Sequence, residues 1–244
     1  MWRKLLDILP GALVGWAEYT FRPAVGGYGI LNGQTGRRRL FEELTKRFAC
    51  DAIVETGAYK ATTTLYFARF AAKVVTIESA SRYFTYSKLR TARVKTIEVL
   101  RGESQNVLPA VLRRPELTGK NIFLYLDAHW GGVLPLAAEI RAIAAFDGRS
   151  MFLIDDFEVP GDAGYRFDAY GGTESLNLDY LGRIDLDRPL FVYFPRLPSG
   201  QETGFLQGYC VGTTCPDVAV LLDGIDMLES SNRRLQRLAG TSAA

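Results

Sequence analysis

The sequence predicts an α/β fold in which a mostly parallel β-sheet is covered by helices on both faces and ends in an antiparallel hairpin. Three observations predict it. Short apolar runs alternate with segments of helical periodicity between residues 52 and 155. The runs have four to seven residues and are mostly apolar, as expected for strands that helices bury on both sides. Near the C-terminus two strand-like runs follow each other with no helix between them, which favours an antiparallel pair.

The alternation of strands and helices argues for βαβ units and a parallel sheet. The expected strands are Ala52–Glu55, Lys73–Glu78, Lys95–Leu100, Asn121–Asp127 and Ser150–Asp155. The expected helices are Trp2–Leu9, Arg37–Phe48, Ala61–Phe70, Ser81–Ala92, Ser104–Arg113 and Leu134–Phe146.

The C-terminal part of the chain has a different character. Pro189–Pro195 and Phe205–Val211 are expected to form the hairpin, because the turn sequence L-P-S-G-Q-E-T-G joins them. Val218–Leu222 is expected to add a short extended piece. Residues 158–177 are rich in Gly, Tyr and Asp and lack periodicity, so we expect a lid-like loop there.

We expect three parts in the chain: an N-terminal helical cap over residues 1–48, a main domain over 49–225, and a C-terminal helix or tail over 226–244. The length of 244 residues suits one α/β domain with additions. The net charge of +2 gives no sign of a nucleic-acid partner. No apolar run is long enough for a membrane span, and Asp7 and Pro10 interrupt the apolar N-terminus, so we expect a cytoplasmic protein.

Polar residues follow the carboxyl ends of four expected strands, where ligands bind in parallel α/β sheets. Gly57 would let the backbone turn sharply beside a ligand, and the helix that begins near Thr62 would present amides to anionic groups. Glu78, 23 residues after Glu55, is placed to accept hydrogen bonds from ribose hydroxyls. Ala61 stands in the turn where a full G-x-G-x-x-G pattern would continue with glycine, and the incomplete pattern argues against a standard NAD site. Each feature taken alone also fits an ordinary turn or a helix cap.

The order of these motifs resembles that of class I S-adenosylmethionine-dependent methyltransferases, over roughly residues 50–215. The shared features are E-x-G-x-x-x-(G/A), an acid after the second strand, G-(D/E)-S after the third and an acid ending the fourth. The resemblance implies a Rossmann-like, doubly wound sheet of the seven-stranded methyltransferase type. It also implies that the cofactor lies against Glu55, Thr56, Gly57, Ala58, Thr62, Glu78, Ser79, Glu103, Ser104 and Asp127.

Three carboxylates are expected at one rim of the sheet, because Asp127 and the pair Asp155-Asp156 end strands that are expected to be neighbours. Carboxylates this close would raise one another's pKa values, and a divalent ion such as Mg²⁺ would relieve the repulsion. The alternative is that Asp155 and Asp156 begin a loop as Asx turns. The trio resembles the Mg²⁺ ligands of metal-dependent sugar O-methyltransferases of the macrocin and aminocoumarin type, although the D-A-H-W sequence departs from that branch.

His129 is the only histidine and lies two residues beyond Asp127. Either side chain would serve as the base that removes a hydroxyl proton, and His129 would also suit a metal ligand or an ordinary loop histidine. Gln34 and Arg37 would either cap the cofactor or acceptor or lie on the first turn of a solvated helix. The aromatic residues Trp130, Tyr165, Phe167 and Tyr170 would stack on the acceptor or pack locally.

The sequence therefore predicts S-adenosylmethionine-dependent, Mg²⁺-assisted O-methylation of a small-molecule acceptor, such as a sugar or a natural product. The alternatives are a dinucleotide-dependent oxidoreductase and a non-catalytic binding protein that has kept the fold. Neither a nucleic acid nor a membrane is expected as a partner. The sequence leaves the acceptor open, and it does not decide between a monomer and a homo-oligomer.

Overall fold

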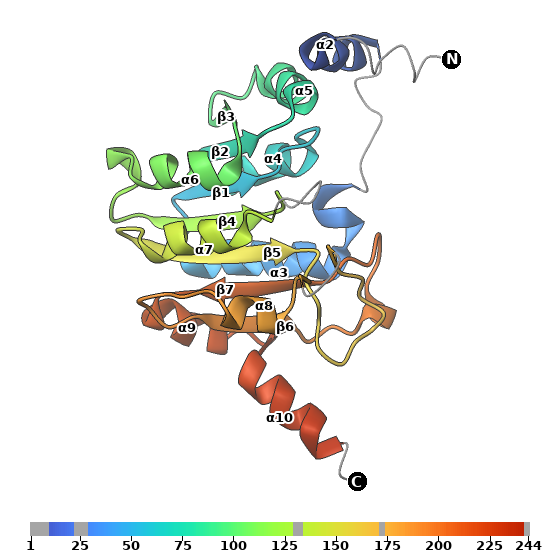
Figure 1. Ribbon diagram of the computed structural model, residues 1–244, viewed down its shortest axis with the longest axis vertical. Coiled ribbons are helices and arrows are strands. Elements are labelled where there is room, and N and C mark those ends of the chain that lie inside the picture. The colour runs from blue at the N-terminus through green and yellow to red at the C-terminus, as the bar shows by residue number, and fades with distance from the viewer. Residues whose placement is uncertain (1–9, 22–28, 129–133, 171–173, 242–244) are drawn as a thin grey trace.

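The computed structural model describes residues 10–21, 29–128, 134–170 and 174–241, and their side chains as far as residue 236. These residues contain an eight-stranded sheet with the strand order β3-β2-β1-β4-β5-β7-β6-β8 (Figure 1). The strands are β1 Ala52–Thr56, β2 Lys73–Glu78, β3 Ile97–Arg101, β4 Asn121–Leu126, β5 Arg149–Asp155, β6 Phe191–Pro195, β7 Tyr209–Thr213 and β8 Leu228–Ser230.

The first five strands are parallel, and the last three pair antiparallel. β1 lies between β2 and β4, so the direction in which successive strands are added to the sheet reverses between β1 and β4. In parallel α/β sheets, ligands bind at the carboxyl ends of the strands beside such a reversal. The predicted fold class is confirmed, with β8 as an additional edge strand.

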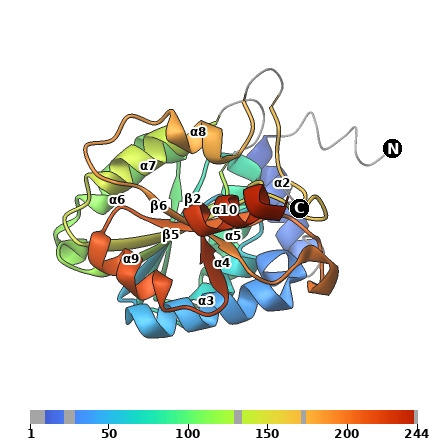
Figure 2. The ribbon, with the colours of Figure 1, turned by 90° about the horizontal axis from the view of Figure 1, so that it is seen from below.

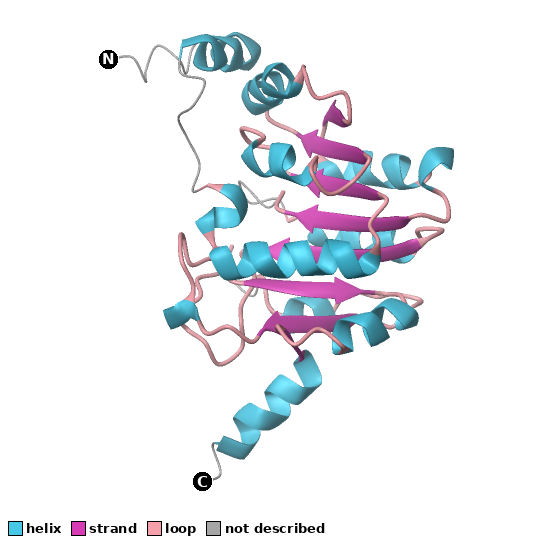
Figure 3. Cartoon of the chain, turned by 180° about the vertical axis from the view of Figure 1, so that it is seen from behind, coloured by secondary structure: helices cyan, strands magenta, loops and turns pink. Residues whose placement is uncertain are grey.

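Helices cover both faces of the sheet (Figures 2 and 3). One face packs against α6 Ser104–Leu112, α7 Leu136–Ala144 and α8 Leu178–Gly182, and the other packs against α3 Thr35–Phe48, α4 Thr62–Phe67 and α9 Pro216–Asp223. At the β3 end, α2 Gly11–Phe21 packs on α5 Ser81–Thr91, and α10 Ser231–Thr241 extends from the opposite end. The short 3-10 helices are η1 Ile30–Gly33, η2 Pro115–Leu117 and η3 Ser199–Gln201. None of these helices is long and apolar enough to cross a membrane, within the residues described.

Two hydrophobic cores result from the pleat of the strands. Ile53 and Val54 are adjacent in β1, yet each enters a different core because successive side chains of a strand point to opposite faces. This is why the central strands carry mostly apolar residues on both faces, and it explains why apolar runs predicted them correctly.

The prediction of an extended piece at Val218–Leu222 is wrong, because these residues belong to α9. Pro216 occupies the first turn of that helix, where its missing N–H costs nothing. Val218, Ala219 and Leu222 are buried at helical spacing. A short apolar run does not by itself distinguish a strand from a buried helix.

The loop over residues 158–177 is attached to the end of the sheet. The Asp168 N–H donates to the Asp156 carbonyl (2.9 Å), and the Glu158 N–H donates to the Leu176 carbonyl (2.7 Å). Arg166 also forms an isolated bridge with Gln207. The predicted hairpin is present between β6 and β7, but its second strand begins at Tyr209 because residues 205–208 form a loop that binds the N-terminal segment. The expected helix Trp2–Leu9 lies outside the described residues.

Candidate functional site at the carboxyl edge of the sheet

The turn between β1 and α4 passes very close to the end of β4. Gly57 has a φ of 89°, and a Cβ at this position would lie 2.2 Å from the backbone oxygen of Asp127. Its N–H donates to the Ile77 carbonyl (2.9 Å), which holds the turn against β2. Ala61 is fully buried and left-handed with a φ of 56°, so alanine adopts here the conformation that a glycine would adopt more easily. Gly57 is thus required by space as well as by backbone angle.

Glu78 lies at the end of β2 and closes the turn from the other side. One carboxylate oxygen accepts the Tyr59 N–H and the other accepts the Ala80 N–H, each at 2.8 Å. Burial raises the pKa of Glu78, although the backbone N–H groups oppose the rise and Glu103 adds to it. A carboxylate oxygen has two lone pairs, so Glu78 retains acceptors for hydroxyl groups. Glu103 and Ser79 are exposed beside it.

Two of the predicted cofactor residues face protein partners instead. Glu55 is buried behind the turn, where its carboxylate accepts hydrogen bonds from the hydroxyls of Thr64 and Thr76, the latter at 2.6 Å. Burial raises its pKa to about 7, against the effect of the two hydroxyls. The Thr62 hydroxyl accepts a hydrogen bond from Arg90 (2.9 Å). Thr56 lies at the end of β1 and is also buried, and its carbonyl accepts the Asp127 N–H (3.0 Å).

Asp127 and Asp156 are carboxyls whose pKa values are raised. The largest effect on the pKa of Asp127 is the loss of hydration, followed by repulsion from Asp155 and Asp156. Together these effects hold its pKa well above the ordinary value. Loss of hydration and repulsion from Asp155 raise the pKa of Asp156 to about 8, although Gln207 donates a hydrogen bond to it. The carboxylates of the predicted trio therefore do influence one another.

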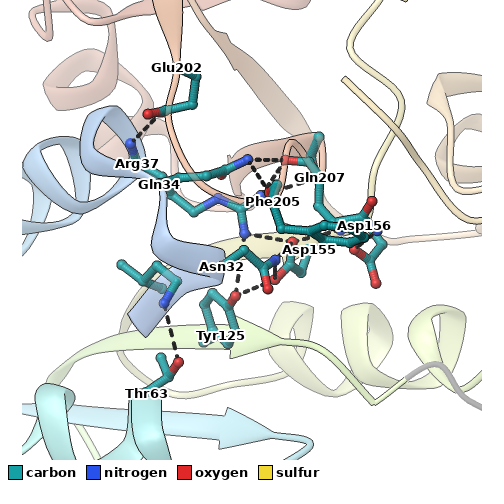
Figure 4. Close-up of polar contacts among 12 residues, drawn as sticks. Asn32, Gln34, Arg37, Thr63, Tyr125, Asp155, Asp156, Glu202, Phe205 and Gln207 are labelled. Carbon is teal, nitrogen blue, oxygen red and sulfur yellow. Dashed lines mark hydrogen bonds and ion pairs between the residues drawn. The ribbon is translucent and has the colours of Figure 1, made fainter. Parts of the chain in front are cut away.

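Asp155 is bound by protein donors on both oxygens (Figure 4). Its Oδ1 accepts Arg37 Nη1 at 2.6 Å and the Asp156 N–H at 2.8 Å. Its Oδ2 accepts Asn32 Nδ2 at 3.0 Å and also the Tyr125 hydroxyl. The side chain is almost completely buried.

Arg37 is the cation of this network and is fully buried at the first turn of α3. Its Nη2 donates to the carbonyls of Gln207 (2.6 Å) and Gly208 (3.3 Å), and its guanidinium lies 4.3 Å from the centre of the Tyr209 ring. Burial is the largest single effect and lowers the pKa of Arg37, but Asp155, Tyr125 and Tyr209 together outweigh burial, so this pKa lies above its ordinary value. The alternative that Arg37 is solvated is wrong.

The loop between β6 and β7 holds the N-terminal segment in place. Glu202 accepts the N–H groups of Gly36 (2.9 Å) and Arg37 (3.0 Å), which are free donors at the start of α3. Gln34 Nε2 donates to the carbonyls of Phe205 (3.0 Å) and Gln207 (2.8 Å). Figure 4 shows Glu202 at the start of α3 and Gln34 against the loop, on either side of Arg37, whose guanidinium reaches Asp155.

As placed here, the predicted magnesium ligands do not fit a metal ion. The oxygens of Asp155 already accept hydrogen bonds from Arg37, Asn32, Tyr125 and the backbone. A carboxylate has about four acceptor positions. Across the described residues, no group of three or more His, Cys, Asp or Glu side chains is arranged to hold a metal.

Glu139 is a buried carboxylate that the sequence analysis did not select. It lies on α7 and has no exposed surface. The hydroxyls of Ser104 and Thr56 lie near enough to favour its charged form, but neither carboxylate oxygen has a hydrogen-bond partner of good geometry among the described residues. Burial dominates and raises its pKa to about 7. Ser104, a predicted cofactor residue, is itself buried, and its hydroxyl has no hydrogen-bond partner of good geometry among the described residues.

Helical spacing was the signal that could have identified Glu139, which the sequence analysis missed, and the burial of Arg37, which it had named without deciding its surroundings. Arg37 precedes Leu40, Leu44 and Phe48 by three, seven and eleven residues, so it lies on the apolar stripe of its helix. Glu139 lies three residues after Leu136 and four before Ile143. A charged residue on a buried helical face is uncommon and needs a partner or a proton.

The remaining predicted residues lie in two places. His129 and Trp130 lie outside the described residues. In the loop, Tyr165 is buried and donates to the Leu197 carbonyl (3.0 Å), Phe167 is exposed, and Tyr170 donates to Asp168 (3.1 Å). Two of the three aromatic side chains in this loop therefore donate hydrogen bonds to protein groups, Tyr165 to the loop between β6 and β7 and Tyr170 within its own loop.

The fold is shared with solved structures of methyltransferases. An O-methyltransferase from Bacillus cereus, solved in complex with SAH, aligns with a TM-score of 0.52 at 13% identity, over 87% of this chain and 96% of its own. A protein from Klebsiella pneumoniae that is assigned as an O-methyltransferase gives a TM-score of 0.52 at 13% identity, over 87% of this chain and 94% of its own. The chain has a methyltransferase fold. No protein-family model matches the sequence, and a search of curated proteins found no match.

Proposed function

We propose that this chain is an S-adenosylmethionine-dependent methyltransferase that methylates a hydroxyl group of a small molecule. The observation that carries the proposal is the tight approach of Gly57 to Asp127, beside Glu78, at the point where the strand order reverses. A methyltransferase fold makes S-adenosylmethionine the first cofactor to test at this edge.

The cofactor would lie along the carboxyl ends of β1 to β4. Gly57 and Ala58 would lie beside its methionine part, Glu78 would accept its ribose hydroxyls, and Glu103 and Ser104 would lie near its adenine. Glu55 would support the turn from behind, because its carboxylate is bound by Thr64 and Thr76. The positive sulfonium would then face an acidic edge, which favours binding of this charge.

Asp127 is the base that we favour, with His129 as the alternative. The raised pKa of Asp127 makes it a stronger base than an ordinary aspartate. It would take the proton of the acceptor hydroxyl as the oxygen attacks the methyl carbon in line, and the carbon–sulfur bond would break to leave S-adenosylhomocysteine. Because the donor is already activated, the protein would contribute mainly position and charge stabilisation. No step passes through a metal, since protein donors already bind the oxygens of Asp155.

The experiment that tests this proposal is binding of S-adenosylhomocysteine, measured by calorimetry and by thermal shift, with NAD⁺ as the competing ligand. A ligand at about 100 times its Kd adds about 2.7 kcal/mol of stability, so the shift should be clear. Glu78→Gln should bind S-adenosylhomocysteine at least tenfold more weakly. Glu98→Gln is the matched control, because Glu98 lies on the neighbouring strand and pairs with Arg114 and Lys73. A shift with NAD⁺ alone would favour the oxidoreductase alternative and refute the proposal.

A further inference from the structure

We propose that Arg37 takes the place of a divalent metal at the acidic edge of the site, so that the predicted methyl transfer proceeds without metal. The statement about methyl transfer rests on the proposed function, whereas the structural claim concerns only Arg37 and the three aspartates. Arg37 acts as a positioning residue: it holds Asp155 and, through it, the end of β5.

The hydrogen-bond geometry around Asp155 supports this assignment. Arg37 Nη1 lies 2.6 Å from Asp155 Oδ1, and both side chains are almost completely shielded from water. Asn32 and Tyr125 donate to the other oxygen. A metal ion bound to Asp155 would have to displace these donors. It would also lie next to the buried guanidinium of Arg37, and two cations close together repel each other.

The rest of the Arg37 guanidinium is bound through Nη2, whereas Nε has no hydrogen-bond partner among the described residues. Nη2 donates to the carbonyls of Gln207 and Gly208, and the ring of Tyr209 lies 4.3 Å from the guanidinium carbon. Arg37 therefore contacts β5 and the loop before β7 at the same time. The planar guanidinium, with donors on two sides, can bind both segments, which the single ammonium group of a lysine would do less well.

The backbone that carries Arg37 is also fixed. A Cβ on Gly36 would lie 2.3 Å from Leu197 Cδ2 and 2.4 Å from a Glu202 oxygen. A Cβ on Gly204 would lie 2.4 Å from the Asn32 carbonyl oxygen, and the Phe205 N–H donates to that same oxygen (2.8 Å). The two segments thus fit closely along their length, so Arg37 is a built part of the site rather than a side chain that happens to reach it.

The test is a metal titration of the full chain after treatment with EDTA, with Mg²⁺ and Mn²⁺ as probes. Calorimetry and melting temperature are the readouts, and both are independent of methyl transfer. The wild type should show no saturable binding. Arg37→Gln removes the charge but keeps an amide donor, and it should gain metal binding with a rise in melting temperature of about 5 °C or more at saturating metal. Arg37→Lys keeps the charge and should remain insensitive to metal.

Arg39→Gln is the matched control, because Arg39 lies on the same helix but is exposed, and it should behave as the wild type does. Saturable Mg²⁺ binding by the wild type that Asp155→Asn abolishes would overturn the inference, as would a folded Arg37→Gln variant that binds no metal. If Arg37→Gln does not fold alone, it is refolded with and without millimolar Mg²⁺. Recovery of the circular dichroism signal only with metal supports the inference, and no recovery overturns it.

S-adenosylhomocysteine binding by the same samples separates the two proposals. If the wild type binds neither metal nor S-adenosylhomocysteine, the proposed function fails while the assignment of Arg37 is still decided by the Arg37→Gln titration. If it binds S-adenosylhomocysteine and also Mg²⁺ through Asp155, the function stands and the assignment of Arg37 fails.

Discussion

Replacing Glu139 with glutamine should stabilise the protein at alkaline pH and leave it little changed at acidic pH. Glu139 has no exposed surface, and within the described residues its oxygens lack hydrogen-bond partners of good geometry. A buried carboxyl without partners is far more stable protonated than charged. Glutamine has nearly the same shape and never carries the charge, so the variant isolates the cost of ionisation.

The magnitude follows from the pKa. Burial raises the pKa of Glu139 from its ordinary 4.5 to about 7. Because the folded pKa lies above the unfolded one, the stability that the protonated group provides is complete below pH 4.5 and is lost progressively as the pH rises through about 7. Each pKa unit corresponds to about 1.4 kcal/mol, so the wild type should lose about 3 kcal/mol through this group. Glu139→Gln should avoid that loss.

The assay is urea denaturation of both proteins from pH 5 to pH 8.5, with the free energy of unfolding read at each pH. The difference between Glu139→Gln and the wild type should grow with pH to about 3 kcal/mol. Glu116→Gln serves as the control because Glu116 is exposed, and it should follow the wild type. A constant difference between Glu139→Gln and the wild type across this range would show that Glu139 does not titrate within it, and would refute the reasoning.

Three further substitutions test the packing around the site. Gly57→Ala should destabilise the fold by more than about 2 kcal/mol and abolish S-adenosylhomocysteine binding, because φ is positive and the new Cβ would lie 2.2 Å from the backbone oxygen of Asp127; urea denaturation and calorimetry check this. Glu202→Ala should cost about 1 kcal/mol, as loss of a helix cap does, since the N–H of Arg37 loses its acceptor; an unchanged urea midpoint would contradict it. Gly15→Ala should release α2, because the added Cβ would lie 2.1 Å from a carbonyl oxygen of α5; faster proteolysis near residue 15, with an intact core, is the expected result.

The sequence was sufficient for the parts of the fold where hydrophobic periodicity and local turn chemistry act together. The inner parallel strands β1, β2, β4 and β5 are buried on both faces, so their apolar runs marked them clearly. The turn at Gly57 was recognisable because the next strand-like run, Lys73–Glu78, and its final acid followed at regular spacing. The prediction of an extended piece at Val218–Leu222 failed because a run of five apolar residues suits a buried helix as well as a strand. Only Pro216, at the start of α9, distinguishes the helix from a strand.

The partners within the site could not be predicted, because they depend on segments distant in the sequence. Asp155 and Arg37 are separated by 118 positions, and the loop that orders Arg37 comes later still. The sequence showed three acids at one edge and no cation near them, so a metal was the simplest way to balance them. The run of three arginines at Arg37 resembled a solvated surface, and only its alignment with Leu40 and Leu44 indicated burial.

The arrangement around Arg37 also indicates whether a divalent metal ion or the guanidinium of Arg37 neutralises the negative charge of the acidic edge. A divalent ion about 5 Å from a guanidinium is repelled by roughly 7 kcal/mol at an effective dielectric of 20, and removing one partner of a buried ion pair costs about 3–5 kcal/mol. A metal at Asp155 would therefore have to overcome both the repulsion and the loss of the Arg37 pair. Since Arg37 lies before β1 and is held by Glu202, the acidic edge is balanced only when the N-terminal segment is docked. The loop between β6 and β7 forms several hydrogen bonds with residues 32–37, so the contacts that hold the start of α3 against the sheet also hold Arg37 beside Asp155.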